Sequence, residues 1–83
     1  MDYILTEHAR ESLNERLIRL EWVDLAFSQP QRIEADRVDS DLEHRLARID
    51  EYGGRVLRVI VNTARKPPRI VTVFFDRGIK NRL

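Results

Sequence analysis

Two runs of β-branched and aromatic residues in the C-terminal half most constrain how this chain can fold. Residues 55–61 (RVLRVIV) and 69–75 (RIVTVFF) each have the length and composition of a strand. Side chains alternate across a strand, so the first run has one purely aliphatic face, made of Leu57, Val59 and Val61. The opposite face carries Arg58 between valine and isoleucine. These runs predict that the C-terminal half forms a sheet.

Two short helices are expected before the sheet. Thr6 is a suitable N-cap for a helix that runs to about Leu17, and Glu7 lies near the positive end of its dipole. A second helix is expected over residues 20–28 and ends before Pro30, because the position before a proline disfavours the helical region. Its apolar face consists of Trp22, Val23, Ala26 and Phe27.

Weaker segments connect the second helix to the strong strands. Residues 31–34 and 44–49 are expected to form short strands, and residues 35–43 an acidic, solvated connection. Gly53 and Gly54, which follow Tyr52, supply hairpin turn chemistry. Together, these elements predict an α+β domain with two N-terminal helices packed on a three- to four-stranded, mainly antiparallel sheet. Eighty-three residues form this one domain, 1–83, without room for a second core.

The composition excludes several classes of function. The chain has no cysteine, which removes disulfides, thiolate nucleophiles and cysteine metal sites. His8 and His44 lack the spacing of a metal motif, and Gly53-Gly54 lacks the frame of a phosphate loop. No apolar run approaches about 20 residues, and the N-terminus does not resemble a signal peptide. We therefore expect a cytoplasmic protein with no membrane segment, metal ion or other cofactor.

Charge is distributed unevenly along the chain. Residues 1–50 carry seven arginines against twelve carboxylates, whereas residues 51–83 carry eight Lys plus Arg against two carboxylates. The basic half suggests a phosphate-rich or acidic partner. The alternative is internal, with a basic sheet packed beside acidic helices and charges balanced across the fold. Both interpretations remain open from the sequence.

Two arginines interrupt apolar patterns on structured elements. Arg58 interrupts a strand, and Arg16 falls within the helical stripe of Ala9 and Leu13, with His8 at its margin. One interpretation places Arg16, Arg58 and His8 around a shared polar surface. In the other, each aliphatic stem lies on the edge of the core while the guanidinium meets water or a carboxylate.

Taken together, these residue types fit metal-free RNA cleavage. That reaction needs one group to take a proton from the ribose 2′-OH, another to protonate the leaving oxygen, and cations to stabilise charge on phosphorus. Histidine titrates near neutrality, and arginine presents a fixed fork to phosphate oxygens. Further basic residues would bind the rest of the RNA backbone: Arg65, Lys66, Arg69, Lys80 and Arg82. Phosphate binding without turnover also fits the composition.

Ordered motifs along nearly the whole chain resemble a known family. LTEHARESL followed by ER, the proline of SQP, GGRVLRVIVN and PRIVTVFFDR resemble the bacterial domain-of-unknown-function 4258 family over about Ile4 to Arg77. The resemblance implies a fold related to RelE/ParE-type toxins, in a broader group with the barnase, EndoU and colicin-type ribonucleases. Many members of that group are metal-independent ribonucleases, often toxins held by a neighbouring antitoxin.

Carried over motif by motif, the resemblance also implies site residues. His8, from the HAR motif, is the implied acid/base. The implied phosphate-binding and transition-state-stabilising residues are Arg16, Arg58 and Arg77. The implied orienting residues are Thr72 and Asp76. We expect the three arginines to cluster on one surface, with His8 near enough to share a phosphate.

One departure from the family pattern concerns the end of the first helix. Leu17-Ile18 stands where the pattern has glycine and isoleucine. A left-handed helix cap is therefore less available, and the turn between the helices is expected to differ.

The leading functional hypothesis is a small, toxin-like, metal-independent ribonuclease that acts on RNA or the ribosome and is held by a cognate antitoxin. The alternative is a non-catalytic module that binds a protein partner or nucleic acid on the same fold. A third hypothesis is an enzyme remnant that keeps the fold without the activity.

Overall fold

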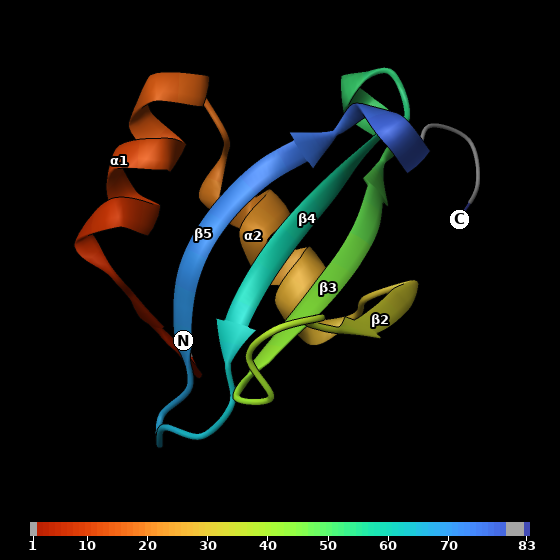
Figure 1. Ribbon diagram of the computed structural model, residues 1–83. Helices are drawn as coiled ribbons and strands as arrows, with labels where there is room; N and C mark the ends of the chain where they lie inside the picture. Colours follow the sequence, from red (N-terminus) through yellow and green to blue (C-terminus); the bar gives the residue numbers. More distant parts are fainter. Residues whose placement is uncertain (1, 80–82) are drawn as a thin grey trace.

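A five-stranded sheet forms the centre of the computed structural model, which describes residues 2–79 and 83 (Figure 1). In chain order the strands are β1 (Ile4–Leu5), β2 (Arg32–Ala35), β3 (Leu42–Ile49), β4 (Arg55–Asn62) and β5 (Arg69–Asp76). Their order in the sheet is β1-β5-β4-β3-β2; β1 runs parallel to β5, and all other neighbours are antiparallel. The predicted α+β class is confirmed. The strand that the sequence did not predict is β1.

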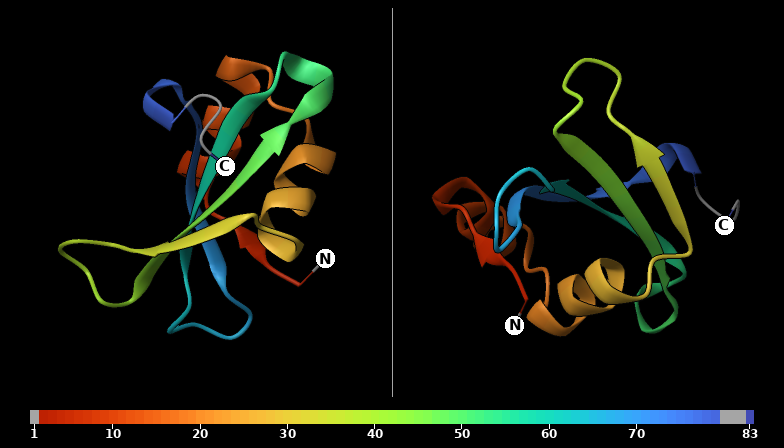
Figure 2. Two further views of the ribbon diagram at one scale, coloured as in Figure 1. Left: turned by 90° about the vertical axis from the view of Figure 1, so that its right-hand side faces the viewer. Right: turned by 90° about the horizontal axis from the view of Figure 1, so that it is seen from below.

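Two helices, α1 (Glu7–Arg16) and α2 (Leu20–Ser28), position the N-terminal half. Figure 2 shows α2 against one face of the sheet and α1 beside the sheet; the contacts assign α2 to β3 and β4 and α1 to β5. Thr6 caps α1, with its Oγ1 accepting the backbone N–H of Ala9 at 3.1 Å, as predicted. No helix in the described part of the chain is long and apolar enough to cross a membrane.

The face of the sheet that α2 covers carries the hydrophobic core. The aliphatic face predicted for β4 is fully buried there, against apolar residues of α2. Ile70 and Val73 of β5 join the same core although they are three positions apart in the chain, because the register between β4 and β5 shifts near Val61. The buried core residues of α2 and β4 are Trp22, Val23, Ala26, Leu57, Val59 and Val61.

The opposite face of the sheet has no helix over it among the described residues (Figure 1). Residues directly opposite each other in antiparallel strands share a face, and Arg58 is opposite Phe74 while His44 is opposite Glu34. We call this the open face. The pairing places on it Glu34, His44, Leu46, Val56, Arg58, Ile60, Thr72, Phe74 and Asp76.

The turn between β3 and β4 sets the register of this hairpin, and so decides which residues of the two strands lie opposite each other on the open face. Asp50–Tyr52 form a 3-10 turn, η1, and Gly53 and Gly54 follow with φ of 69° and 71°. Both glycines thus adopt the left-handed region, which confirms the predicted hairpin turn. A second 3-10 turn, η2 (Arg77–Ile79), follows β5.

Helix α1 covers the edge of β5 that β1 leaves free. β1 pairs only with Arg69 and Ile70. Further along β5, Thr6 Oγ1 donates to the carbonyl of Val71 at 3.1 Å, and Arg16 Nη1 donates to the carbonyl of Val73 at 3.1 Å. A free strand edge otherwise offers unpaired backbone groups to other chains. The two side chains satisfy these carbonyls and fix α1 beside β5.

The end of α1 corrects the expectation for Leu17. This residue has φ 54° and ψ 43°, so it adopts the left-handed cap although it is not glycine. The N–H of Ile18 donates to the carbonyl of Leu13 at 2.9 Å and closes the helix, which ends at Arg16. The helix therefore keeps a left-handed cap with leucine in place of glycine. The Cβ of Leu17 makes this conformation sterically unfavourable.

We predict that Leu17→Gly raises the free energy of unfolding by about 0.5–1 kcal/mol. Glycine removes the Cβ that strains this conformation, and its greater freedom in the unfolded chain offsets only part of the gain. Leu17 is 83% exposed, so little packing is lost. Urea denaturation measures the difference. Leu17→Ala keeps the Cβ and is the control; an equal gain in that variant, or a loss in the glycine variant, would contradict this explanation.

Candidate functional site

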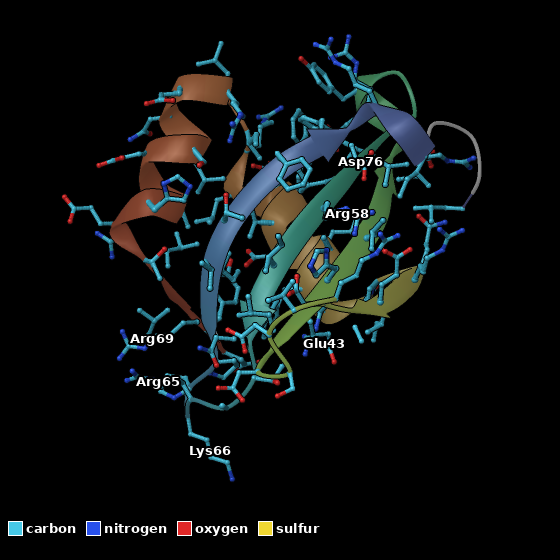
Figure 3. The ribbon with its side chains drawn as sticks, in the orientation of Figure 1. Glu43, Arg58, Arg65, Lys66, Arg69 and Asp76 are labelled. Atoms are coloured by element: carbon cyan, nitrogen blue, oxygen red, sulfur yellow. The ribbon has the colours of Figure 1, made fainter. Side chains whose placement is uncertain are left out.

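Arg58 lies at the centre of a polar network on the open face, beside Asp76 (Figure 3). The residue is only 9% exposed. Its Nε donates to Asp76 Oδ2 at 2.9 Å, its Nη2 lies 2.8 Å from the same oxygen, and its Nη1 donates to Glu34 Oε1 at 3.0 Å. A guanidinium this buried requires such partners, because an unpaired charge in the interior is very costly. Carboxylates of β2 and β5 therefore compensate Arg58.

His44 of β3 completes the network. Its Nδ1 lies 2.7 Å from Arg58 Nη1, and since a guanidinium only donates, Nδ1 is the acceptor. The proton of the neutral ring is then on Nε2, which donates to Asp36 Oδ1 at 2.7 Å. Both ring nitrogens of His44 are thus engaged within the fold.

The network keeps the carboxylates of Glu34 and Asp36 ionised. Hydrogen bonds from the backbone N–H of Asp39, the His44 ring and the backbone N–H of Val38 lower the pKa of Asp36 to about 2. The hydrogen bond from Arg58 is the main cause that lowers the pKa of Glu34. Both groups carry charge at neutral pH; Glu34 balances Arg58, and Asp36 binds the His44 ring. The sequence did not predict this role of Glu34, Asp36 and His44.

Arg58→Ala is predicted to lower the free energy of unfolding by about 2–3 kcal/mol. Removing one partner of a buried ion pair costs several kcal/mol, and the effect is reduced here because the Glu34 side chain is 38% exposed. Chemical denaturation measures the loss. Arg48→Ala is the control, since its partner Asp50 has a side chain that is 82% exposed, and it should cost less than about 0.5 kcal/mol. Equal losses in the two variants would contradict a structural role for Arg58.

Three further arginines surround a cavity at the end of β5. The cavity has a volume of about 430 Å³, and its lining residues are Arg16, Tyr52, Arg55, Phe74, Phe75 and Arg77. We call it the arginine pocket. An adjoining cavity of about 410 Å³ shares Arg55, Phe75 and Arg77 and extends to Asp76. Arg16 and Arg77 were expected to lie together, whereas Arg55 and Tyr52 were not among the predicted site residues.

The arginines of the pocket differ from Arg58 in having no carboxylate partner within residues 2–79 and 83. Arg16 donates to the backbone carbonyl of Val73, and the Cζ of Arg55 lies 4.9 Å from the centroid of the Tyr52 ring. The Arg77 side chain makes no hydrogen bond or ion pair in the described chain. Three uncompensated guanidinium groups around one cavity favour the binding of an anion.

Aromatic rings fix the position of Arg55. Tyr52 lies 5.1 Å from Trp22 and 5.0 Å from Phe75 between ring centroids, and Trp22 lies 5.9 Å from Phe75. These contacts hold η1 between α2 and β5, which is a favourable use of aromatic surface. Because Arg55 lies over the Tyr52 ring, the cluster directs one guanidinium towards the pocket.

Asp76 connects the network to the arginine pocket. One of its oxygens, Oδ2, binds Arg58, and the other, Oδ1, accepts the backbone N–H of Gly78 at 2.8 Å. The carboxylate therefore fixes the start of η2, where Arg77 lies. Thr72 lies on the open face, in the row of Ile60 and His44.

His8 is not part of the hydrogen-bonded network around Arg58. It is exposed in the first turn of α1, and in the described chain it has no hydrogen bond or ion pair with any side chain. It precedes Arg16 by eight residues, which is about 12 Å along the helix axis. The structure therefore joins Arg58 to Asp76, and Arg16 to Arg77, but does not bring His8 into either group.

The predicted backbone-binding residues lie at the other end of β5. Figure 3 shows Arg65, Lys66 and Arg69 together, away from Arg58 and Asp76. Seven residue steps along β5 separate Arg69 from Asp76, which corresponds to about 23 Å. Lys80 and Arg82 lie outside the described residues. Within the described residues, no group of three or more His, Asp or Glu side chains is placed to hold a metal ion.

This chain belongs to the family described as Domain of unknown function (DUF4258), whose sequence profile matches residues 5–75. The match confirms the family indicated by the motifs. It includes His8, Arg16, Arg58 and Thr72 and ends just before Asp76. No curated protein and no solved structure was found to match the chain.

Proposed function

We propose that this protein is a metal-independent ribonuclease of the RelE/ParE-like type. The observation that carries the proposal is the arginine pocket, where Arg16, Arg55 and Arg77 surround one cavity without a carboxylate partner in the described chain. RNA offers a phosphate at every nucleotide, and arginine forks bind phosphate oxygens well. The family resemblance supports the type of ribonuclease.

The open face provides a path for the RNA. The arginine pocket lies at one end of β5, and Arg65, Lys66 and Arg69 lie at the other, with a helix-free face of the sheet beside them. A strand of RNA across this face meets basic side chains at both ends. Contacts of this kind bind the backbone irrespective of base sequence.

Cleavage would proceed by attack of the ribose 2′-oxygen on the adjacent phosphorus, which forms a 2′,3′-cyclic phosphate and breaks the bond to the 5′-oxygen. A base takes the proton of the 2′-OH, and an acid or water gives a proton to the departing 5′-oxygen. The pocket arginines stabilise the additional negative charge on phosphorus. The family resemblance makes His8 the acid/base candidate; its imidazole is exposed, and the RNA would have to extend about 12 Å along α1 from Arg16 to reach it. Arg58 has four of its five N–H donors engaged by Asp76, Glu34 and His44, so we assign it a positioning role.

The alternative is a binding module without turnover, and one observation favours it. The residues that line the arginine pocket include neither a histidine nor a carboxylate. Both nitrogens of His44 are engaged, and His8 is about two helical turns from Arg16. In this alternative the same surface binds RNA or an acidic protein partner. A cognate antitoxin would be a partner in either case.

The test is cleavage of mixed-sequence RNA and of ribosome-bound mRNA in EDTA. The native protein should cleave, Arg77→Ala should cleave about 100-fold more slowly, and His8→Ala should lose at least as much. Arg10→Ala is the matched control, since Arg10 is an exposed arginine of α1 outside the pocket. It should retain activity within about twofold.

RNA binding measured on the same variants separates the two candidates. Binding without cleavage by the native protein would establish the module without turnover. Loss of cleavage in Arg10→Ala equal to that in Arg77→Ala would show that total charge, and not the arginine pocket, determines activity.

A further inference from the structure

Phe74 differs from the other aromatic residues beside the arginine pocket. Its neighbour Phe75 packs against the rings of Trp22 and Tyr52. Phe74 is opposite Arg58 in the register, so it lies on the open face, and in the described chain it has no ring partner. It is only partly buried. The core therefore does not account for a phenylalanine at this position.

Phe74 lies beside the arginines that are proposed to bind an anion. Phe74 lines the arginine pocket together with Arg16 and Arg77, at the place where the pocket meets the open face. The volume of about 430 Å³ falls in the range of cavities that hold small ligands. An apolar ring beside uncompensated guanidinium groups is complementary to a ligand with a flat aromatic part and an anionic part.

Tyr52 is less suited to this role than Phe74. The guanidinium of Arg55 lies over the Tyr52 ring, and Trp22 and Phe75 contact that ring as well. A ligand base would have to displace Arg55 to stack on Tyr52. Phe74 requires no such displacement of an aromatic or cationic partner.

We propose that Phe74 is the stacking platform for one nucleobase of a single-stranded RNA whose adjacent phosphate lies in the arginine pocket. This inference rests on the proposed function and adds the class of substrate. Every base has a π-face, so an aromatic platform of this kind tolerates any sequence. Bases in a duplex are stacked on each other, so the platform selects single strands. An acidic peptide would use the arginines but gain nothing from the ring.

The test compares two oligonucleotides that the protein cannot cleave because they lack the attacking 2′-OH. One is a short single-stranded 2′-O-methyl RNA, and the other has the same backbone without bases. Fluorescence anisotropy measures the binding of both by the native protein, Phe74→Leu, Phe74→Trp and Arg77→Ala. Thermal melting checks that each variant is folded.

Phe74→Leu should weaken binding of the base-containing strand about tenfold and leave the abasic strand unchanged, because leucine keeps the apolar volume but loses the π-face. Phe74→Trp should retain binding of the base-containing strand. Arg77→Ala should weaken the binding of both strands. A duplex of the same sequence should be insensitive to Phe74→Leu.

The outcomes distinguish this inference from the proposed function. An equal effect of Phe74→Leu on both strands, or no effect on either, overturns the stacking platform and leaves the ribonuclease proposal in place. If the expected pattern is found but native RNA is not cleaved, the platform is supported and only the ribonuclease proposal fails. If the native protein binds neither strand, or binds poly-glutamate more tightly than RNA, the inference is overturned together with the role of RNA.

Discussion

A buried guanidinium in the central part of the sheet is the constraint on which the polar half of this structure depends. Arg58 must be compensated where it lies, and partners come from β2, β3 and β5, namely Glu34, His44 and Asp76. One side chain thus connects four strands on the open face. Because Asp76 also binds the backbone of η2, the same ion pair fixes the position of Arg77. The network therefore supports the arginine pocket without forming part of its lining.

The uneven charge of the sequence has two explanations in the structure, at different places. Arg58 is balanced internally by carboxylates, one of them from the acidic N-terminal part of the chain. Arg16, Arg55 and Arg77 have no such partner in the described chain, and backbone or aromatic contacts hold the first two. An arginine that is already paired contributes stability, whereas an unpaired arginine that is held in place is available to a ligand. This difference separates the structural arginine from the candidate binding arginines.

Local patterns predicted the helices, the Thr6 cap, the hairpin turn and the faces of β4, because each depends on a few adjacent residues. β1 has only two residues and pairs with a strand more than sixty residues away, so no local pattern indicates it. The contact of His44 with Arg58 depends on the register that the turn imposes, and that of Tyr52 with Arg55 on packing against α2. The sequence and the family resemblance singled out Arg16, Arg58 and Arg77, but they could not divide these arginines between a compensated network and a cavity.

The salt dependence of RNA binding measures most directly whether the arginine pocket binds phosphate. Each phosphate contact to a single strand contributes about 0.7 to the slope of log K against log salt. Replacing Arg16, Arg55 and Arg77 by glutamine removes the three positive charges of the pocket and should lower the slope by about 2. Replacing the exposed residues Arg10, Arg19 and Arg37 by glutamine should leave it nearly unchanged. An unchanged slope in the pocket variant, or an equal decrease in the surface variant, would contradict phosphate binding in the arginine pocket.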